Sequence, residues 1–215
     1  MNDDNWELIN GPLAHHIERL NNVNILNVIE ALITLFTGFG VSNPNAPLLM
    51  PNELALKELH RTATIFLLNK PGEYRDCPVH VRDGSGAVIY QPPPHTEVQT
   101  LMTDFFKELI TTWGPPRDAL DAAAFALWRI NWIHPFKNGN GRTARSFAYC
   151  CLCARLGVVL PGSPTVIDQI MTTRSDYEAA IRVGDAAAAI NNGRDLSAMR
   201  AYLDRLLQIQ IASVP

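Results

Sequence analysis

An all-α domain that carries one small β-hairpin is the fold class predicted by this sequence. Apolar residues recur at helical spacing through most of the chain, and only one segment is typical of β-structure. Glycines and prolines lie between the helical stretches rather than inside them. The chain has 215 residues, 47% of them hydrophobic, which is enough for one domain with a sizeable core and argues against disorder.

The N-terminal half predicts two helices separated by a break. Helical spacing runs from Leu13 to Phe36, and the glycines and prolines of "GFGVSNPNAPLLMPNE" then interrupt it. The next helix is expected to start at Asn52 as its cap, with Glu53 in the first turn.

The hairpin is predicted between residues 77 and 90. Two β-prone runs, Val79–Val81 and Ala87–Tyr90, flank "RDGSG", whose Asp83-Gly84 pair favours a tight turn. Four helices of clear pattern are expected beyond it: Thr96–Trp113, a buried central helix that ends at Ile133, Arg142–Leu156 and Leu196–Ile211. We divide the chain into an N-terminal helical arm, residues 1–50, and a core, residues 51–211.

Composition excludes several classes of function. The net charge is −3 and no long basic run occurs, so we expect no nucleic-acid partner. The start, "MNDDNWELING", lacks the pattern of a signal peptide, and the apolar stretch Ile25–Phe36 is too short to span a bilayer, so we expect no membrane contact. The four cysteines do not fit a disulfide framework. We interpret them as buried, reduced thiols, which predicts a cytoplasmic protein.

The segment "HPFKNGNGR", residues 134–142, is the strongest functional signal. Gly139 and Gly141 allow a close approach of backbone N–H groups to a ligand, and a turn that leads into a helix start forms an anion-binding concavity. Arg142 and Arg145 share a helix face there, where positive charge opposes the helix dipole unless an anion binds. A glycine-rich turn with arginines is by itself more often a solvated helix start.

His134 makes the combination more specific. It precedes Pro135, where the helix must end and the backbone is expected to be extended. An imidazole beside an anion site suits a general base near neutral pH. Phe136 is expected to anchor the loop in the core, and His60 to be a satisfied core or capping histidine. For Arg75, an active-site role and a structural ion pair both stay open.

The segment "HPFKNGNGRTAR" resembles the Fic signature HPFx(D/E)GN(G/K)RxxR. "ELHRT" with "GEYR" resembles the entry to the family's hairpin, and "VIYQPPPHTEV" its exit; "TRSDYEAAIRVGD" and "DLSAMRAYLDRLL" resemble its closing helices. The resemblance implies a Fic-type helical bundle with a hairpin flap at about residues 77–90. It also implies an enzyme that transfers AMP from ATP to a Tyr, Thr or Ser hydroxyl of a target protein.

The resemblance implies a role for each signature residue. His134 would deprotonate the hydroxyl, the amides around Gly139–Gly141 and the Asn140 side chain would hold phosphate oxygens, and Arg142 and Arg145 would neutralise the phosphate chain. Tyr177 and Asp185 would line the adenine pocket, although a core role for Tyr177 is an equal alternative and the family commonly has Asn at the position of Asp185. An extended target segment would pair with the flap residues Val79, His80, Val81, Val88, Ile89 and Tyr90.

Position 138 departs from the family pattern, because Asn138 stands where an Asp or Glu ligates Mg²⁺. An amide oxygen ligates Mg²⁺ without bringing charge. We therefore expect weakened binding of Mg²⁺ or Mn²⁺ and reduced activity, or use of a different nucleotide or diphosphate donor. A weakly active nucleotide-binding regulatory module is the alternative function. Gly141 favours nucleotidyl transfer over the kinase activity of the related Doc toxins.

Regulation is the second departure. Many family members carry an inhibitory (S/T)xxxE(G/N) helix, and none of the nine glutamates here lies in such a motif. One hypothesis is a separate antitoxin-like protein that supplies the glutamate, and the alternative is an unrestrained or feeble enzyme. A homo-oligomer is also left open.

Overall fold

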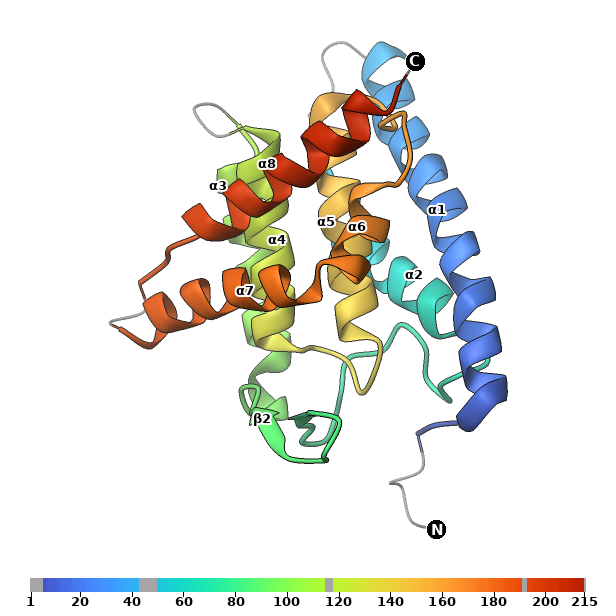
Figure 1. Cartoon of the computed structure of the whole chain (residues 1–215), viewed down its shortest axis with the longest axis vertical. Helices are drawn as coiled ribbons and strands as arrows, with labels where there is room; N and C mark the ends of the chain where they lie inside the picture. Colours follow the sequence, from blue (N-terminus) through green and yellow to red (C-terminus); the bar gives the residue numbers. More distant parts are fainter. Residues whose placement is uncertain (1–5, 43–49, 115–117, 191–192, 215) are drawn as a thin grey trace.

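The computed structural model describes residues 6–42, 50–114, 118–190 and 193–214. Within them the chain forms a helical bundle with one short hairpin, as Figure 1 shows, so the predicted fold class is confirmed. The elements are α1 (Gly11–Ser42), α2 (Glu53–Thr64), β1 (Val81–Arg82), β2 (Val88–Tyr90), the 3₁₀ turn η1 (His95–Glu97), α3 (Val98–Thr112), α4 (Ala119–Ile133), α5 (Asn140–Leu156), α6 (Val166–Thr172), α7 (Arg174–Ala189) and α8 (Ser197–Ala212).

Helices α4 and α5 form the centre of the bundle and pack against each other. Both are apolar almost all round, and most of their side chains are buried. Helices α3, α7 and α8 contact α4, whereas α1 and α2 contact α5. The loop between the two central helices, residues 134–139, therefore emerges at one end of the bundle.

Capping side chains fix where α2 and α4 begin. The Asn52 side chain accepts a hydrogen bond from the Ala55 N–H at 3.1 Å, which confirms the predicted cap. Asp118 and Asp121 form a reciprocal capping box at the start of α4. These caps set the register of the helix that carries His134.

Helix α1 is longer than the predicted 13–36 span and joins the common core. Ile25, Ile29 and Ile33 are buried in the same hydrophobic cluster as α4 and α5. Just before α1, Glu7 pairs with Leu68 in an isolated antiparallel bridge. The division into an arm and a core stays a prediction, and residues 1–5 and 43–49 of the arm lie outside the described residues.

The hairpin is shorter than the sequence pattern indicated. Its strands pair Val81 with Tyr90 and Arg82 with Val88, with an irregularity between them. The turn is wider than a two-residue turn, and Asp83 organises it by accepting bonds from Ser85 and from the Ala87 N–H. The residue with positive φ in this turn is Gly86 rather than Gly84.

All four cysteines were expected to be buried; this is confirmed for the three clustered thiols and is wrong for Cys77, which is half-buried. Cys150, Cys151 and Cys153 are free and buried, and burial raises the pKa of all three thiols. Among the described helices, none has both the length and the apolar character needed to cross a membrane.

Candidate active site

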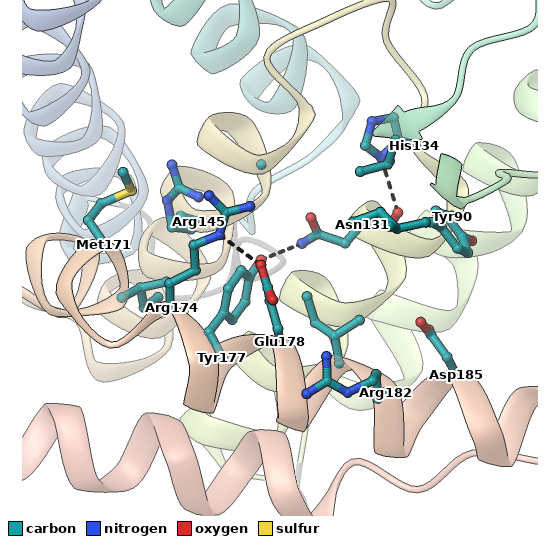
Figure 2. A pocket seen from close by; sticks show the side chains of 15 residues that line it. Tyr90, Asn131, His134, Arg145, Met171, Arg174, Tyr177, Glu178, Arg182 and Asp185 are labelled. Atoms are coloured by element: carbon teal, nitrogen blue, oxygen red, sulfur yellow. Dashed lines mark hydrogen bonds and ion pairs between the residues drawn. The ribbon is translucent and has the colours of Figure 1, made fainter. Parts of the chain in front are cut away.

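A cavity of about 710 Å³ lies where the hairpin, the junction of α4 and α5, and helices α6 and α7 meet. This volume is within the range usual for sites that hold a small molecule. Figure 2 shows the cavity, and α7 presents a row of polar side chains along it. The lining residues are Val81, Ile89, Tyr90, Asn131, His134, Gly141, Arg145, Ile170, Met171, Arg174, Tyr177, Glu178, Ile181, Arg182 and Asp185.

His134 ends α4 and lines this cavity. Its backbone is left-handed, with φ 53° and ψ 58°, so the expectation of an extended residue before Pro135 is wrong. Proline excludes the helical region for the preceding residue, and a single left-handed residue turns the chain while its own N–H still bonds to the Ile130 carbonyl at 2.9 Å.

The imidazole of His134 is arranged as a base. Its Nδ1 lies 3.4 Å from the Asn131 carbonyl oxygen, and a carbonyl accepts only, so this contact places the proton on Nδ1 and leaves the Nε2 lone pair free. Burial lowers the pKa of His134 from 6.5 to about 4, and the nearby Arg75 adds to the decrease. The ring is therefore neutral at pH 7.

The signature loop is held by buried contacts beneath it. Phe136 is fully buried and stacks on His60, with ring centroids 3.7 Å apart, so the predicted anchoring role is confirmed. The Asn140 side chain is buried and bonds the Phe136 backbone twice, accepting from its N–H and donating to its carbonyl, each at 2.8 Å. Its amide is thus engaged in shaping the loop rather than directed into the cavity.

His60 is a satisfied structural histidine. Its Nδ1 accepts from the Gly72 N–H at 2.8 Å, and its Nε2 donates to the Asn138 carbonyl at 3.0 Å. Burial is the largest cause that lowers its pKa to about 4, so both bonds are made by the neutral ring.

The start of α5 offers unpaired N–H groups. Gly139 precedes it in a left-handed conformation, with φ 76°, and a Cβ there would lie 2.6 Å from Thr64 Cγ2. In the part of the chain that the structure describes, the N–H groups of Asn140, Gly141 and Arg142 have no hydrogen-bond acceptor. Three adjacent donors at a helix N-terminus favour an anion.

Arg145 adds a buried cation to the same place. It lines the cavity, its Nε is buried without a hydrogen-bond partner, and among the described residues its guanidinium forms no ion pair. Burial lowers the pKa of Arg145, and the charges of Arg142 and Arg174 lower it further. An unpaired buried cation beside a helix N-terminus is unfavourable, and a bound anion would relieve it.

Arg142 and Asn138 point to another part of the surface. Arg142 donates to the Ala63 carbonyl at 3.0 Å and pairs with Glu18 of α1 at 3.3 Å. The Asn138 amide donates to the Glu7 carboxylate at 3.0 Å, and its Oδ1 accepts from the Gly139 N–H at 2.6 Å. Two carboxylates from the N-terminal segment thus hold two residues of the signature, and neither residue lines the large cavity.

Position 138 is also where the family resemblance places a metal ion. Within the described residues no group of three or more His, Cys, Asp or Glu side chains is placed to hold one. Mg²⁺ in nucleotide sites takes few protein ligands, because phosphate oxygens and waters complete its shell. The Asn138 oxygen keeps a second lone pair beside its bond to the Gly139 N–H, so it could add one neutral ligand to a weakly held ion.

Tyr177 and Asp185 form the wall of the cavity on α7. Tyr177 is buried, and its hydroxyl accepts from the Asn131 amide at 2.8 Å. Asp185 accepts from the Trp128 indole N–H at 2.9 Å, and burial raises the pKa of Asp185. Tyr177 thus belongs both to the core and to the cavity.

The flap closes the cavity on the remaining side. Val81, Ile89 and Tyr90 line it, whereas Val88 is exposed and Val79 is buried before β1. His80 is exposed and also precedes β1.

Four polar residues of the cavity were not predicted. Arg174, Glu178 and Arg182 repeat every four residues on one face of α7, and Arg174 pairs with Glu178 at 2.7 Å. This four-residue spacing could have been recognised in the sequence as a polar face of the helix. Asn131 lies one turn before His134, and it and Arg129 are the two polar residues of the otherwise apolar stretch 122–133.

Comparisons with known proteins show which family part of the chain matches. Residues 51–152 match the model of the Fic/DOC family. A stretch of 68 residues is 37% identical to the protein adenylyltransferases fic-1 of Caenorhabditis briggsae and Caenorhabditis elegans. It covers 32% of this chain and only 12% of those proteins.

Solved structures resemble the whole fold. A Fic domain-containing signalling protein from Bacteroides thetaiotaomicron aligns with a TM-score of 0.67 and 22% identity, over 95% of this chain and 72% of that one. Fic-1 from C. elegans aligns with a TM-score of 0.63 and 20% identity, over 95% of this chain and 53% of that one. At these identities the likeness concerns the fold. The match to the Fic/DOC family model thus covers residues 51–152, which include the signature loop and both central helices.

Proposed function

We propose that this protein is a protein adenylyltransferase, which transfers AMP from ATP to a Tyr, Thr or Ser hydroxyl of a target protein. One observation carries the proposal: a neutral imidazole and an unpaired buried arginine line the same cavity, beside a helix start with unpaired N–H groups. The sequence likeness to protein adenylyltransferases supports the choice of reaction.

The cavity provides the parts that such a transfer needs. The N–H groups of residues 140–142 and the Arg145 guanidinium would hold the triphosphate. His134 Nε2 would accept the proton of the target hydroxyl as its oxygen attacks the α-phosphorus. The new O–P bond forms while the bond to pyrophosphate breaks, and positioning with charge neutralisation supplies most of the rate enhancement. Tyr177 and Asp185 would face the nucleoside.

Asn138 would contribute its oxygen to a divalent ion, with Glu7 beside it. Mg²⁺ or Mn²⁺ bound there would neutralise charge on the phosphate chain. Since the amide is uncharged, most of the ion's ligands would come from ATP and water.

The flap would present the target. Val88 and Ile89 are 46% and 55% exposed at the edge of the cavity, and an extended segment added to this two-stranded sheet would place a hydroxyl near His134. Main-chain pairing of this kind depends little on the side chains of the target segment. An antitoxin-like inhibitory protein and a homo-oligomer stay hypotheses.

The contacts of Arg142 with Glu18 and of Asn138 with Glu7 favour a second candidate. With both signature residues held by carboxylates, the protein would bind a nucleotide weakly and act as a regulatory module. A third candidate keeps the chemistry and changes the donor, because the Asp185 carboxylate offers only acceptors to a base.

Incubation with α-labelled ATP, Mg²⁺ or Mn²⁺ and cell lysate tests the proposal. Label on a protein is expected, and it should disappear in His134→Ala but persist in the control His95→Ala, which alters a histidine outside the cavity. Calorimetric ATP binding measured in parallel separates the candidates. Binding without transfer in both metals would support the regulatory module, and transfer from another labelled nucleotide would support a different donor.

A further inference from the structure

The end of α4 receives hydrogen bonds from the hairpin and from the segment just before it. A helix leaves its last carbonyls without intrahelical partners. Here the Trp132 carbonyl accepts from the Tyr90 hydroxyl at 2.5 Å, and the Ile133 carbonyl accepts from Arg75 Nη2 at 3.4 Å. The next carbonyl, that of His134, accepts from Arg75 Nε at 2.7 Å.

Arg75 also binds both ends of the hairpin. Its Nη1 donates to the Cys77 carbonyl before β1 at 3.4 Å, and its Nη2 donates to the Pro93 carbonyl after β2 at 2.6 Å. Its backbone N–H donates to the Pro135 carbonyl at 2.8 Å. Arg75 is only 3% exposed and, among the described residues, pairs with no carboxylate. The structural ion pair considered from the sequence is therefore replaced by a set of carbonyl contacts.

We infer that Arg75 is a positioning residue for His134, which fixes the base and the docking flap in one mutual geometry. A single guanidinium contacts the backbone of His134, the end of its helix and both ends of the hairpin. The inference rests on the proposed transfer reaction, in which the base and the hydroxyl delivered by the flap must meet within a few tenths of an ångström.

The chemistry of the guanidinium explains why arginine stands here. Its planar fork carries five N–H donors, whereas lysine has a point charge with three donors. Carbonyl groups at a helix C-terminus stabilise a cation, so the buried charge is tolerated without a carboxylate. Loss of the fork would leave several buried carbonyls without partners.

Arg75 also acts on His134 electrostatically. Its positive charge is one of the causes that keep the pKa of His134 low, after burial. A variant that loses this charge should therefore titrate differently at His134, which gives a measurement independent of turnover.

Three variants test the inference: Arg75→Met, Arg75→Lys and the control Arg205→Met. Arg205 lies on α8, outside the cavity and the flap, is exposed, and pairs with Asp176 at 2.7 Å. Arg75→Met should raise the pKa of His134, followed by ¹⁵N NMR of the imidazole, and should lower kcat by about tenfold or more with KM for ATP within about twofold. Arg75→Lys should keep the pKa low and still lower kcat. Arg205→Met should change neither quantity.

An unchanged kcat and an unchanged His134 pKa in Arg75→Met would overturn the inference. If that variant does not fold, Arg75→Lys decides, because wild-type kcat in a folded lysine variant would equally overturn it. A wild-type protein that transfers nothing refutes the proposed function, whereas the His134 titration in Arg75→Met still tests the electrostatic contact on its own.

Discussion

At His134 the backbone turn places the imidazole where burial and the charge of Arg75 both lower its pKa. The pH dependence of transfer should follow this lowered pKa. The pKa is lowered from 6.5 to about 4, so the base form persists as pH falls and is lost only near pH 4. Activity per folded molecule should thus stay nearly constant from pH 7.5 to 5.5. An ordinary imidazole would lose about 90% of its base form over that range. A kcat/KM profile with its acid limb near 6.5 would contradict this.

In the proposed reaction, Asn138 would set the affinity of the site for its divalent ion. Asn138→Asp should tighten Mn²⁺ binding in the presence of a non-hydrolysable ATP analogue by about tenfold, because a carboxylate replaces a neutral oxygen. It would also face the Glu7 carboxylate, which now lies 3.0 Å from the amide nitrogen. The free protein should therefore lose thermal stability, and adding Glu7→Gln should restore it. Glu7→Gln alone is the control, and equal Mn²⁺ affinities in wild type and Asn138→Asp would exclude the site.

In the proposed reaction, Glu18 would compete with phosphate for Arg142. Their 3.3 Å pair is partly exposed, and such pairs contribute about 0.2–1 kcal/mol. Glu18→Gln should release the guanidinium and tighten ATP binding by about two- to fivefold, measured by calorimetry. Glu30→Gln, farther along α1, is the matched control. Weaker ATP binding in Glu18→Gln would show instead that Glu18 holds Arg142 in a useful position.

At the scale of elements, the loop between α4 and α5 owes its shape to one glycine. Gly139→Ala would need a left-handed alanine whose Cβ lies 2.6 Å from Thr64 Cγ2, and should lower the free energy of unfolding by about 1–3 kcal/mol. Thr64→Ser removes that methyl and keeps the hydroxyl bond to the His60 carbonyl, so it should partly rescue Gly139→Ala. Gly141→Ala, whose Cβ meets only the end of Arg145 at 3.3 Å, should cost less. Equal losses in urea unfolding for the two glycine variants would contradict this account.

The elements also show what local sequence could predict. Helical periodicity and the Asn52 cap depend on neighbours within one or two turns, and those predictions agree with α2, α4 and α5. The signature is contiguous, so its base and its anion-binding turn were visible in one stretch. Contacts between distant segments could not be predicted, because no local pattern indicates that Glu7 contacts Asn138 or that Arg75 donates to the carbonyls at the end of α4.

At the scale of the whole molecule, the family match and the fold converge on a site built at the end of the bundle where α4 and α5 are joined. The hairpin, α7 and the N-terminal segment all reach this end, and each adds side chains to it. Two histidines lie at this end of the fold: His60 holds the signature loop from beneath, and His134 lines the cavity. Because burial keeps both imidazoles neutral in the folded state, a fall in pH should destabilise the whole fold through their protonation.

The stability of the protein should fall as pH decreases from 6.5 to 4. The folded-state pKa values of His60 and His134 are lowered to about 4, so the unfolded chain binds more protons in this window and folding becomes less favourable. Each histidine accounts for about 3 kcal/mol across the window. Asp118, whose pKa is lowered from 3.8, acts at lower pH. Urea unfolding at pH 7, 6, 5 and 4.5 should show the slope, and His60→Gln, which keeps a donor and an acceptor but does not titrate, should reduce it by about half. An unchanged slope in His60→Gln would mean that this ring does not carry the acid sensitivity of the fold.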